Sequence, residues 1–327
     1  MVVAVGGYYG FRNAGDEAIL SAIVSEARRR GHEVTVLSAD PGRTVRDHGV
    51  RAVHRYRPQD VVRAIAGSEL FALGGGGLLQ DRTSRRSLLY YLSLVRLARA
   101  MARPAVAFNV SLGPLSRLGR RLVRGGLRGV GLVVRDRRSL ALARELGLSP
   151  ELGADPALLL TPPTTQREPN LVVLIPRHGV DPRPLAAAGR ALAGLGYEVL
   201  ALALQPGRDD EALAEFSGLN REATSDPRRV LYLAASAGYV VSARLHGMIL
   251  AAAAGTPFAG VDYDPKVAAF AEETRSPLLP LSPDPGEVVR VVSEGVRPDW
   301  PAVARLKERA RDSFDRLLAT PAPAGGP

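Results

Sequence analysis

Short apolar runs alternate with segments of helical periodicity along this chain, and this alternation constrains the fold more than any other feature. In the first half, the runs typical of strands occupy residues 2–5, 34–37, 70–73, 105–110 and 130–134. The helical patterns lie between them, at residues 17–30, 60–66, 88–102, 118–127 and 139–146. Repeated βαβ units build a parallel sheet with helices on both faces. The sequence therefore predicts an α/β fold of the doubly wound, Rossmann-like type.

The alternation stops once and then restarts, which predicts two domains. Residues 161–170 contain three prolines and show no periodicity, as is typical of a linker. Strand and helix patterns return afterwards, and 327 residues are enough for two domains. We expect the following organisation: a first domain over 1–160, the linker over 161–170, a second domain over 171–299, a C-terminal helix over 300–319 and a disordered tail over 320–327.

The composition narrows the classes of function. The chain has no cysteine and no pair of histidines at helical spacing, so we expect neither a metal site nor a bound cofactor. It lacks a long apolar run and a basic signal-like start, which favours a cytoplasmic location. The net charge of +10 favours anionic partners such as phosphates or membrane surfaces. Aromatic residues make up only 5%, and no basic tract is interleaved with them, so we expect no nucleic-acid partner.

An arginine and a histidine follow a predicted strand at residues 238–241, at the point where a helix begins. These residues, Arg244 and His246, lie in the segment Ser-Ala-Arg-Leu-His-Gly. In open α/β sheets, ligands bind at the carboxyl ends of strands. Arginine offers a planar set of donors to an anion, and histidine can move a proton near neutral pH. The alternative is that both residues only cap and pack the helix.

Two glycine-rich segments also follow predicted strands. In the first, Asn13 and Asp16 could cap a helix or contact sugar hydroxyls. In the second, Gly75 and Gly76 would let the backbone approach a substrate, and the next polar pair, Gln80 and Asp81, could bind a sugar or cap a helix. Neither segment has the spacing of a dinucleotide-binding fingerprint or of a Walker loop.

The order of five motifs resembles that of the polysaccharide pyruvyl transferase family. These motifs are Asn-x-Gly-Asp-Glu-Ala from Asn13, the Gly-Gly-Gly-x-Leu-x-Gln-Asp segment that ends at Asp81, the Arg-Asp element at Arg135, Asp-Pro-Ala at Asp155, and Arg-x-His-Gly from Arg244. The resemblance extends over residues 1–275. It is greatest to the branch that pyruvylates a cell-wall polymer used to anchor bacterial surface layers.

The resemblance implies a donor, an acceptor and roles for residues. The donor would be phosphoenolpyruvate, and the acceptor a lipid-diphosphate-linked disaccharide that gains a pyruvate ketal on the 4- and 6-hydroxyls of N-acetylmannosamine. The two domains would resemble those of GT-B glycosyltransferases, with the acceptor on the first and the donor on the second. His246 would be the general acid and base, and Arg135 and Arg244 would hold the donor's anionic groups. Lys266 follows the strand predicted at residues 258–261 and could bind phosphate.

Two other functions remain open: a GT-B-like glycosyltransferase that uses a nucleotide sugar, and a non-catalytic protein that binds carbohydrate or phosphate. Release of phosphate in place of a nucleotide would separate the two enzymes.

One further partner follows from charge. Five arginines share one face of the helix predicted at residues 118–127, and they favour weak peripheral contact with an anionic membrane; a solvated basic face is the alternative. They are Arg117, Arg120, Arg121, Arg124 and Arg128. The sequence makes no prediction of the oligomeric state.

Overall fold

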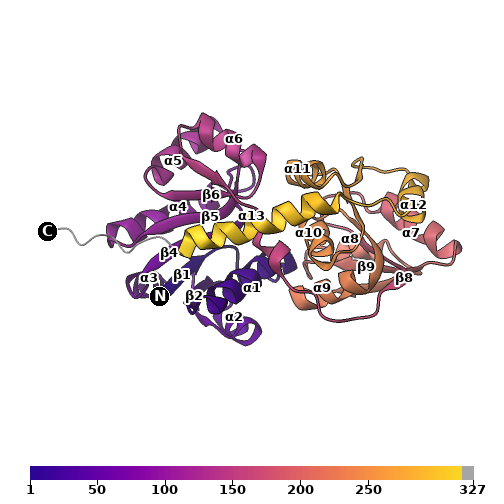
Figure 1. Ribbon diagram of the computed structural model, residues 1–327, viewed down its shortest axis with the longest axis horizontal. Coiled ribbons are helices and arrows are strands. Elements are labelled where there is room, and N and C mark those ends of the chain that lie inside the picture. Colours follow the sequence, from indigo (N-terminus) through magenta and orange to yellow (C-terminus); the bar gives the residue numbers. More distant parts are fainter. Residues whose placement is uncertain (319–327) are drawn as a thin grey trace. The chain divides into compact units, whose positions relative to one another are not determined.

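Two parallel sheets organise residues 1–318, which are the residues that this computed structural model describes (Figure 1). The first sheet has seven strands in the order β3-β2-β1-β4-β5-β6-β7, and the second has six in the order β10-β9-β8-β11-β12-β13. Both contain the doubly wound order, in which the chain reverses direction across the sheet beside the first strand. The reversal lies between β1 and β4 in one sheet and between β8 and β11 in the other. The predicted α/β class is confirmed.

The first unit consists of Met1–Phe11, Ile19–Pro156 and the chain from Lys307 onward. Its strands are β1 (Val2–Gly6), β2 (Glu33–Ser38), β3 (Arg51–His54), β4 (Leu70–Leu79), β5 (Ala105–Leu112), β6 (Gly131–Val134) and β7 (Pro150–Leu152). Its helices are α1 (Ala14–Arg29), α2 (Pro41–His48), α3 (Pro58–Ala66), α4 (Arg85–Ala100), α5 (Arg117–Leu127) and α6 (Arg137–Glu145).

The second unit consists of Arg12–Ala18 and Ala157–Leu306, so the first turn of α1 belongs to it. Its strands are β8 (Glu168–Ile175), β9 (Glu198–Ala203), β10 (Asn220–Ala223), β11 (Ala237–Ser242), β12 (Phe258–Val261) and β13 (Leu278–Leu279). Its helices are α7 (Arg183–Gly194), α8 (Asp210–Ala214), α9 (Pro227–Ser236), α10 (Leu245–Ala254), α11 (Pro265–Thr274) and α12 (Pro285–Ser293), and a short 3-10 turn (Pro156–Leu159) precedes β8. The last helix, α13 (Trp300–Leu318), starts in this unit and ends in the first.

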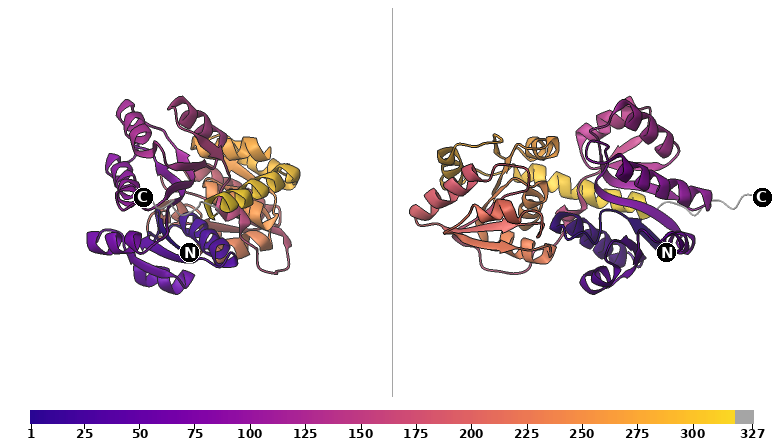
Figure 2. Two further views of the ribbon diagram at one scale, coloured as in Figure 1. Left: turned by 60° about the vertical axis from the view of Figure 1, so that its left-hand side comes forward. Right: turned by 180° about the vertical axis from the view of Figure 1, so that it is seen from behind.

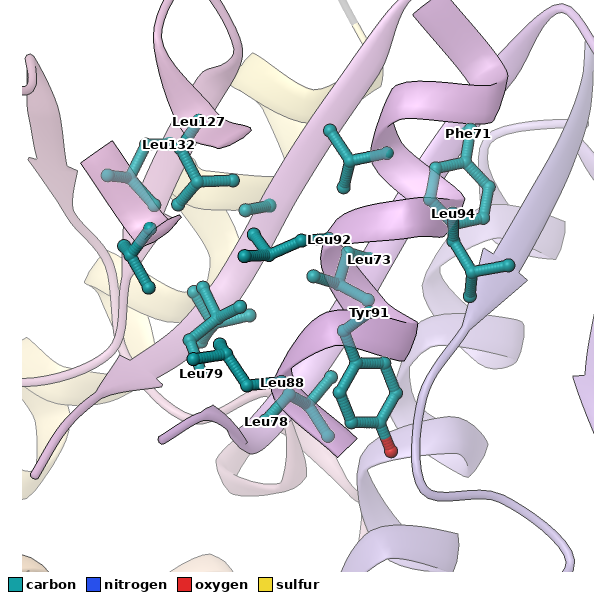
Figure 3. Close-up of a cluster of buried hydrophobic side chains, with 14 of the residues drawn as sticks. Phe71, Leu73, Leu78, Leu79, Leu88, Tyr91, Leu92, Leu94, Leu127 and Leu132 are labelled. Atoms are coloured by element: carbon teal, nitrogen blue, oxygen red, sulfur yellow. The ribbon is translucent and has the colours of Figure 1, made fainter. Parts of the chain in front are cut away.

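Helices α3, α4, α5 and α6 supply the apolar side chains that cover one face of the first sheet (Figure 3). Phe71 and Leu73 of β4 are fully buried there, against Tyr91 and Leu94 of α4. Burial of each such side chain contributes roughly 1.5–3 kcal/mol, so this layer accounts for much of the unit's stability.

Helices α1 and α13 also pack on the first sheet. Phe108 of β5 meets Phe314 of α13 edge-on, with ring centroids 4.8 Å apart. The next residue, Asn109, is buried in a left-handed conformation with φ of 48° and donates a hydrogen bond of 2.7 Å to Ser313. The register between β5 and β6 shifts at this point, which allows two successive residues to reach α13.

The second sheet also lies between two groups of helices (Figure 2). Helices α7 and α12 contribute Leu185, Leu192 and Val288 to the core on one face. On the other face, Met248 of α10 and Val267 of α11 pack so closely on β12 that a β-carbon on Gly260 would lie 2.8–2.9 Å from them.

Several elements differ from the expectation. The glycines after residue 73 form no loop, because β4 continues to Leu79 and Gly74 and Gly76 pair with β5. The strand β8 begins at Glu168, inside the expected linker, and residues 161–167 have no regular structure. Short strands such as β7, β10 and β13 were not predicted, since two to four residues show little periodicity. The final helix matches, and the tail expected to be disordered, 320–327, lies outside the described residues.

Replacing Gly75 by alanine should destabilise the first unit more than the same change at Gly31. Both glycines are left-handed, with φ of 55° and 76°. A β-carbon on Gly75 would lie 2.2 Å from Ile19, whereas one on Gly31 would meet nothing within 4 Å. Gly31→Ala therefore carries only the conformational cost of about 1–2 kcal/mol. Gly75→Ala adds an overpacking cost of about 1–3 kcal/mol.

Urea denaturation of both variants measures this difference. Adding Ile19→Ala to Gly75→Ala provides the control, because it removes the obstructing side chain and should recover part of the overpacking cost. Equal losses for Gly75→Ala and Gly31→Ala would contradict the explanation by packing.

Candidate active site

The carboxyl edge of the second sheet gathers cationic, imidazole and phenol side chains from three neighbouring strands. Arg177 follows β8, Arg244 and His246 follow β11, and Tyr263 and Lys266 follow β12. These strands are adjacent in the order β8-β11-β12, and the reversal of the sheet lies between the first two. A doubly wound sheet binds ligands at this position. The edge is therefore the leading candidate for an active site.

A hydroxyl-based turn sets the course of the chain from β11 into α10. The Ser242 hydroxyl accepts a hydrogen bond of 3.0 Å from the amide of Arg244 and donates one of 2.6 Å to the carbonyl of the same residue. A β-carbon on Gly247 would lie 2.2 Å from this hydroxyl, so the glycine is required by packing. The turn places Arg244 at the N-cap of α10 and His246 in its first turn. No side chain caps this helix, so its first amides remain oriented for an anion.

Asp209 holds Arg244 in place. The carboxylate of Asp209 is fully buried and accepts hydrogen bonds from the Arg244 guanidinium and from the amides of His178 and Gln205, the last two at 3.0 and 3.1 Å. The Gln205 side chain accepts a second bond from Arg244, at 3.3 Å. A buried ion pair is stable only when its remaining hydrogen-bonding positions are satisfied, and these amides supply that. They orient Arg244 before any ligand arrives.

Arg177 is the second arginine at this edge, and the sequence analysis did not single it out. Its guanidinium lies over the ring of Tyr263, 4.0 Å from the centroid. Burial lowers the pKa of the Arg177 guanidinium; Tyr263 opposes this shift and the positive charge of Arg244 adds to it. Two cations close enough to influence each other in this way are stabilised by an anion that binds both.

Each of the two arginines keeps a buried donor without an acceptor. The Nε atoms of Arg177 and Arg244 are inaccessible to solvent and have no hydrogen-bond partner. Buried donors are nearly always satisfied in native proteins. The Nε atoms of Arg55 and Arg103 are likewise buried and unsatisfied. Arg177 and Arg244 differ from them in lying at the carboxyl edge of one sheet, where doubly wound folds bind ligands. Carboxylates and phosphates are the acceptors that guanidinium groups bind best.

The N-terminal motif contacts the histidine of the candidate site. A β-carbon on Gly15 would lie 2.2 Å from Nδ1 of His246, so only glycine allows this approach. Asn13 accepts a hydrogen bond of 3.0 Å from the Gly15 amide and caps α1, and the Ala14 amide donates 2.9 Å to the Leu204 carbonyl. The structure therefore brings Asn13 and His246 to one place, and Asp16 follows in the first turn of α1.

Two other residues after these strands have simple surroundings. Asp264 caps α11 by accepting a hydrogen bond of 3.0 Å from the Lys266 amide. Lys266 itself is half-buried in the first turn of that helix. His178, in the loop after β8, is exposed.

In the first unit, Arg135 is part of a buried network. It donates to the Ser111 hydroxyl at 2.6 Å and to the Asp155 carboxylate at 2.5 Å, and it is only 8% exposed. Asp136 also has a structural partner, because it caps α6 by accepting from the Ser139 amide at 2.7 Å. The family resemblance implies that Arg135 binds an anionic group of the donor. In the structure its guanidinium binds the carboxylate of Asp155.

The polar residues after β4 also bond within the first unit. Gln80 accepts from the Thr83 amide at 3.0 Å, and Asp81 accepts from the Ser116 amide at 2.8 Å. Burial alone would raise the pKa of Asp81, but the bonds from Ser116 outweigh it and lower that pKa. Gly76, like Gly75, is left-handed, with φ of 85°. Backbone conformation and packing thus account for these glycines without a substrate.

Two residues of the candidate site, Arg177 and Asp209, were not predicted from the sequence, and only the first could have been. Arg177 stands two residues after β8, as Arg244 stands two residues after β11, so parallel placement could have identified it. Asp209 lies in a loop after β9, and no local pattern connects it to Arg244.

Residues 1–318 contain neither a metal-binding cluster nor a membrane-spanning helix. No three histidine, aspartate or glutamate residues among them are grouped to hold a metal ion. No helix in the same range is both long and apolar enough to cross a membrane.

Solved structures of similar fold include an epimerase and two glycosyltransferases. The UDP-GlcNAc 2-epimerase of Neisseria meningitidis matches with a TM-score of 0.62 and 12% identity, over 97% of this chain and 99% of the other. The glycosyltransferase SnogD of Streptomyces nogalater matches at 0.57 and 15%, over 98% and 99%. The calicheamicin glycosyltransferase CalG4 matches at 0.54 and 17%, also over 98% and 99%. This likeness concerns the fold, which is GT-B-like.

Sequence comparison is more specific. A comparison with the curated proteins found no match. The family model described as "Polysaccharide pyruvyl transferase" matches residues 13–265, which include Asn13 at one end and the Arg244–His246 element near the other. Because the match extends over more than half of its length, the chain belongs to the polysaccharide pyruvyl transferase family.

Proposed function

We propose that this protein transfers the pyruvyl group of phosphoenolpyruvate to two hydroxyls of one sugar in a lipid-diphosphate-linked disaccharide. The acceptor we favour is N-acetylmannosamine, which would gain a 4,6-ketal in the synthesis of a cell-wall polymer that anchors a surface layer. Family membership supports pyruvyl transfer to a polysaccharide. The observation that supports phosphoenolpyruvate as the donor substrate is the pair of arginines, Arg177 and Arg244, beside His246. Each has a buried Nε that makes no hydrogen bond.

Phosphoenolpyruvate suits this site because it carries a carboxylate and a phosphate on neighbouring positions. Arg244, oriented by Asp209, and Arg177, stacked on Tyr263, would each bind one of these groups. The uncapped start of α10 and the side chain of Lys266 would support the phosphate. As phosphate leaves, the same cations would stabilise its growing charge.

His246 would transfer the proton that starts the reaction. It would protonate the methylene carbon of phosphoenolpyruvate, which makes the central carbon electrophilic, and a sugar hydroxyl would attack that carbon and lose its proton. The bond between this carbon and the phosphate oxygen then breaks, phosphate leaves with the electron pair, and the second hydroxyl closes the ketal. One hydroxyl proton ends on the new methyl group and the other on phosphate. Asn13 and Asp16, beside His246 in the chain's first motif, would contact the acceptor hydroxyls.

For Arg135 the geometry supports a structural role. Its charge is already balanced by Asp155, and its Nε donates to Ser111. Our proposal therefore replaces Arg135 by Arg177 as the partner of Arg244 in donor binding.

The defining experiment incubates the protein with phosphoenolpyruvate and a panel of lipid-linked disaccharides, in the presence of a chelator. We expect stoichiometric release of phosphate and a product heavier by one pyruvate ketal, without added metal. Turnover of a nucleotide sugar with nucleotide release would instead support a glycosyltransferase. Binding of sugar or phosphate without any turnover would support a non-catalytic protein.

His246→Ala should remove at least 99% of the phosphate-release activity while the protein remains folded and still binds phosphoenolpyruvate. General acid–base groups contribute roughly 10²–10⁴-fold to rate, which sets this expectation. Circular dichroism and donor titration provide the two controls. The exposed His178→Ala is the matched variant and should retain normal turnover. A His246→Ala enzyme with a tenth of the original rate would refute the assignment.

Arg177→Lys and Arg244→Lys should each raise the KM for phosphoenolpyruvate by about 10- to 100-fold. A lysine keeps the charge but loses the planar pair of donors, and one hydrogen bond to a charged group is worth about 1.5–3 kcal/mol. Arg135→Ala should behave differently, because loss of one partner of a buried ion pair lowers the free energy of unfolding by about 3–5 kcal/mol.

Steady-state kinetics and urea denaturation of the three variants test this assignment together. If Arg135→Ala raised the KM at unchanged stability while Arg177→Lys left the KM unchanged, Arg135 and not Arg177 would be the donor-binding arginine, as the family resemblance implies.

A further inference from the structure

One segment accounts for the net positive charge of this chain. Residues 82–135 contain twelve arginines and no lysine, aspartate or glutamate. The rest of the chain carries a net charge of −2, although the whole chain is +10. A general excess of arginine would have raised the charge evenly along the sequence, so this segment needs a local explanation.

The structure exposes most of these arginines on two helices of the first unit. Nine of the twelve are exposed, and none of the nine forms an ion pair with another described residue. They are Arg82, Arg85, Arg86, Arg96 and Arg99 in and before α4, and Arg117, Arg121, Arg124 and Arg128 in and after α5. Arg120 is half-buried and pairs with Glu145 of α6. Most of the positive charge of the segment thus lies at the surface without an ion-pair partner among the described residues.

The helices α4 and α5 lie side by side and point the same way, so their arginines belong to one surface. At their starts, Asp81 before α4 accepts the Ser116 amide at the N-cap of α5. Further along, a β-carbon on Gly126 in the last turn of α5 would lie 2.8 Å from Leu92 in the middle of α4. At their ends, Arg99 donates a hydrogen bond of 3.2 Å to the Arg128 carbonyl. We call the exposed arginines of this helix pair the α4–α5 surface.

Two exposed leucines accompany the arginines. Leu89 of α4 is 50% exposed and Leu118 of α5 is 51% exposed. Each has exposed arginines on the same helix within four residues, Arg85 and Arg86 beside Leu89, and Arg117 and Arg121 beside Leu118. Cations that attract anionic headgroups, together with apolar side chains that enter the headgroup layer, are the chemistry of peripheral membrane binding.

We infer that the α4–α5 surface binds an anionic lipid bilayer. Nucleic acid is the competing polyanion, but proteins that bind single strands combine cations with exposed aromatic rings on which bases stack. On α4, Tyr91 is buried, and Tyr90 is half-buried with its hydroxyl donating 3.0 Å to the Arg55 carbonyl. The large apolar side chains that α4 and α5 themselves expose are Leu89 and Leu118; the exposed ring of Tyr56, 5.9 Å from that of Tyr90, lies outside these helices, in the turn after β3.

The location of this surface relates it to the proposed acceptor. In a parallel sheet, the helix after each strand starts at the carboxyl edge, so the starts of α4 and α5 lie at the edge that carries Gln80 and Asp81. Membrane binding through these starts would bring a lipid-linked sugar to that edge. This last step rests on the proposed function, whereas bilayer binding rests on charge and exposure alone.

The test measures co-sedimentation of the full chain with vesicles of phosphatidylcholine, alone or mixed with phosphatidylglycerol, over a series of salt concentrations. The variant is Arg117→Gln, Arg121→Gln and Arg124→Gln combined. The control combines Arg221→Gln, Arg228→Gln and Arg297→Gln, which removes the same total charge from three exposed arginines of the second unit that form no ion pair with another described residue. At about 1 kcal/mol per arginine near an anionic surface, the first triple variant should partition about a hundredfold more weakly, and the control should match the original protein.

Four outcomes would overturn the inference: equal partitioning onto neutral and anionic vesicles, no effect of salt, equal loss in both triple variants, or displacement from vesicles by single-stranded nucleic acid at equal phosphate concentration. A parallel assay separates this inference from the proposed function. The first triple variant should lose rate on an acceptor embedded in vesicles and keep its rate on the same disaccharide with a short, water-soluble chain. If the original protein pyruvylates neither acceptor, the proposed function fails while the vesicle result stands.

Discussion

The carboxylate of Asp209 is the group on which the arrangement of the candidate site depends. It is fully buried, and it accepts the Arg244 guanidinium and two backbone amides from the chain after β8 and β9. Without this negative charge, burial of Arg244 beside Arg177 would be strongly unfavourable, because two desolvated cations repel each other. With it, the cluster tolerates both arginines and still leaves their Nε donors unsatisfied. The site is thus organised to carry one more anion.

Several residues in the motifs by which the family resemblance was found have structural roles, whether or not they also contact a substrate. Asn13 caps α1, Asp136 caps α6, and Gly75 makes room for Ile19. At its functional edge, a doubly wound unit needs capped helix starts and a close approach between strand and helix. Residues of a sequence motif can therefore serve the fold as well as the chemistry. Arg244 and His246 differ from these residues, since neither is required to complete a cap.

Hydrophobic periodicity and the proline-rich break were enough to predict the fold class, the longer strands and helices, and the restart of the strand and helix pattern near residue 170. They located Arg244 and His246 at a strand end, because the position of a residue after an apolar run is visible in the sequence. They failed where the relevant information is non-local. The continuation of β4 through four glycines depends on pairing with β5. The partner of Arg135 lies twenty residues away, and that of Arg244 thirty-five. Charge compensation of this kind gives no periodic pattern, so the sequence could not show that Asp155 balances the charge of Arg135.

The contact between Gly15 and His246 has a consequence for how the protein is made. These residues are separated by 231 positions, and the imidazole packs where a side chain on Gly15 would be. At ribosomal rates of about 5–20 residues per second, the first motif waits roughly 10–50 s for its partner to be synthesised. The first sheet can form during that interval, but the start of α1 belongs to the second unit and finds its place only once β11 and α10 exist. Completion of the candidate site is therefore a late event in biosynthesis, because a nascent chain that ends before residue 246 lacks the imidazole against which Gly15 packs.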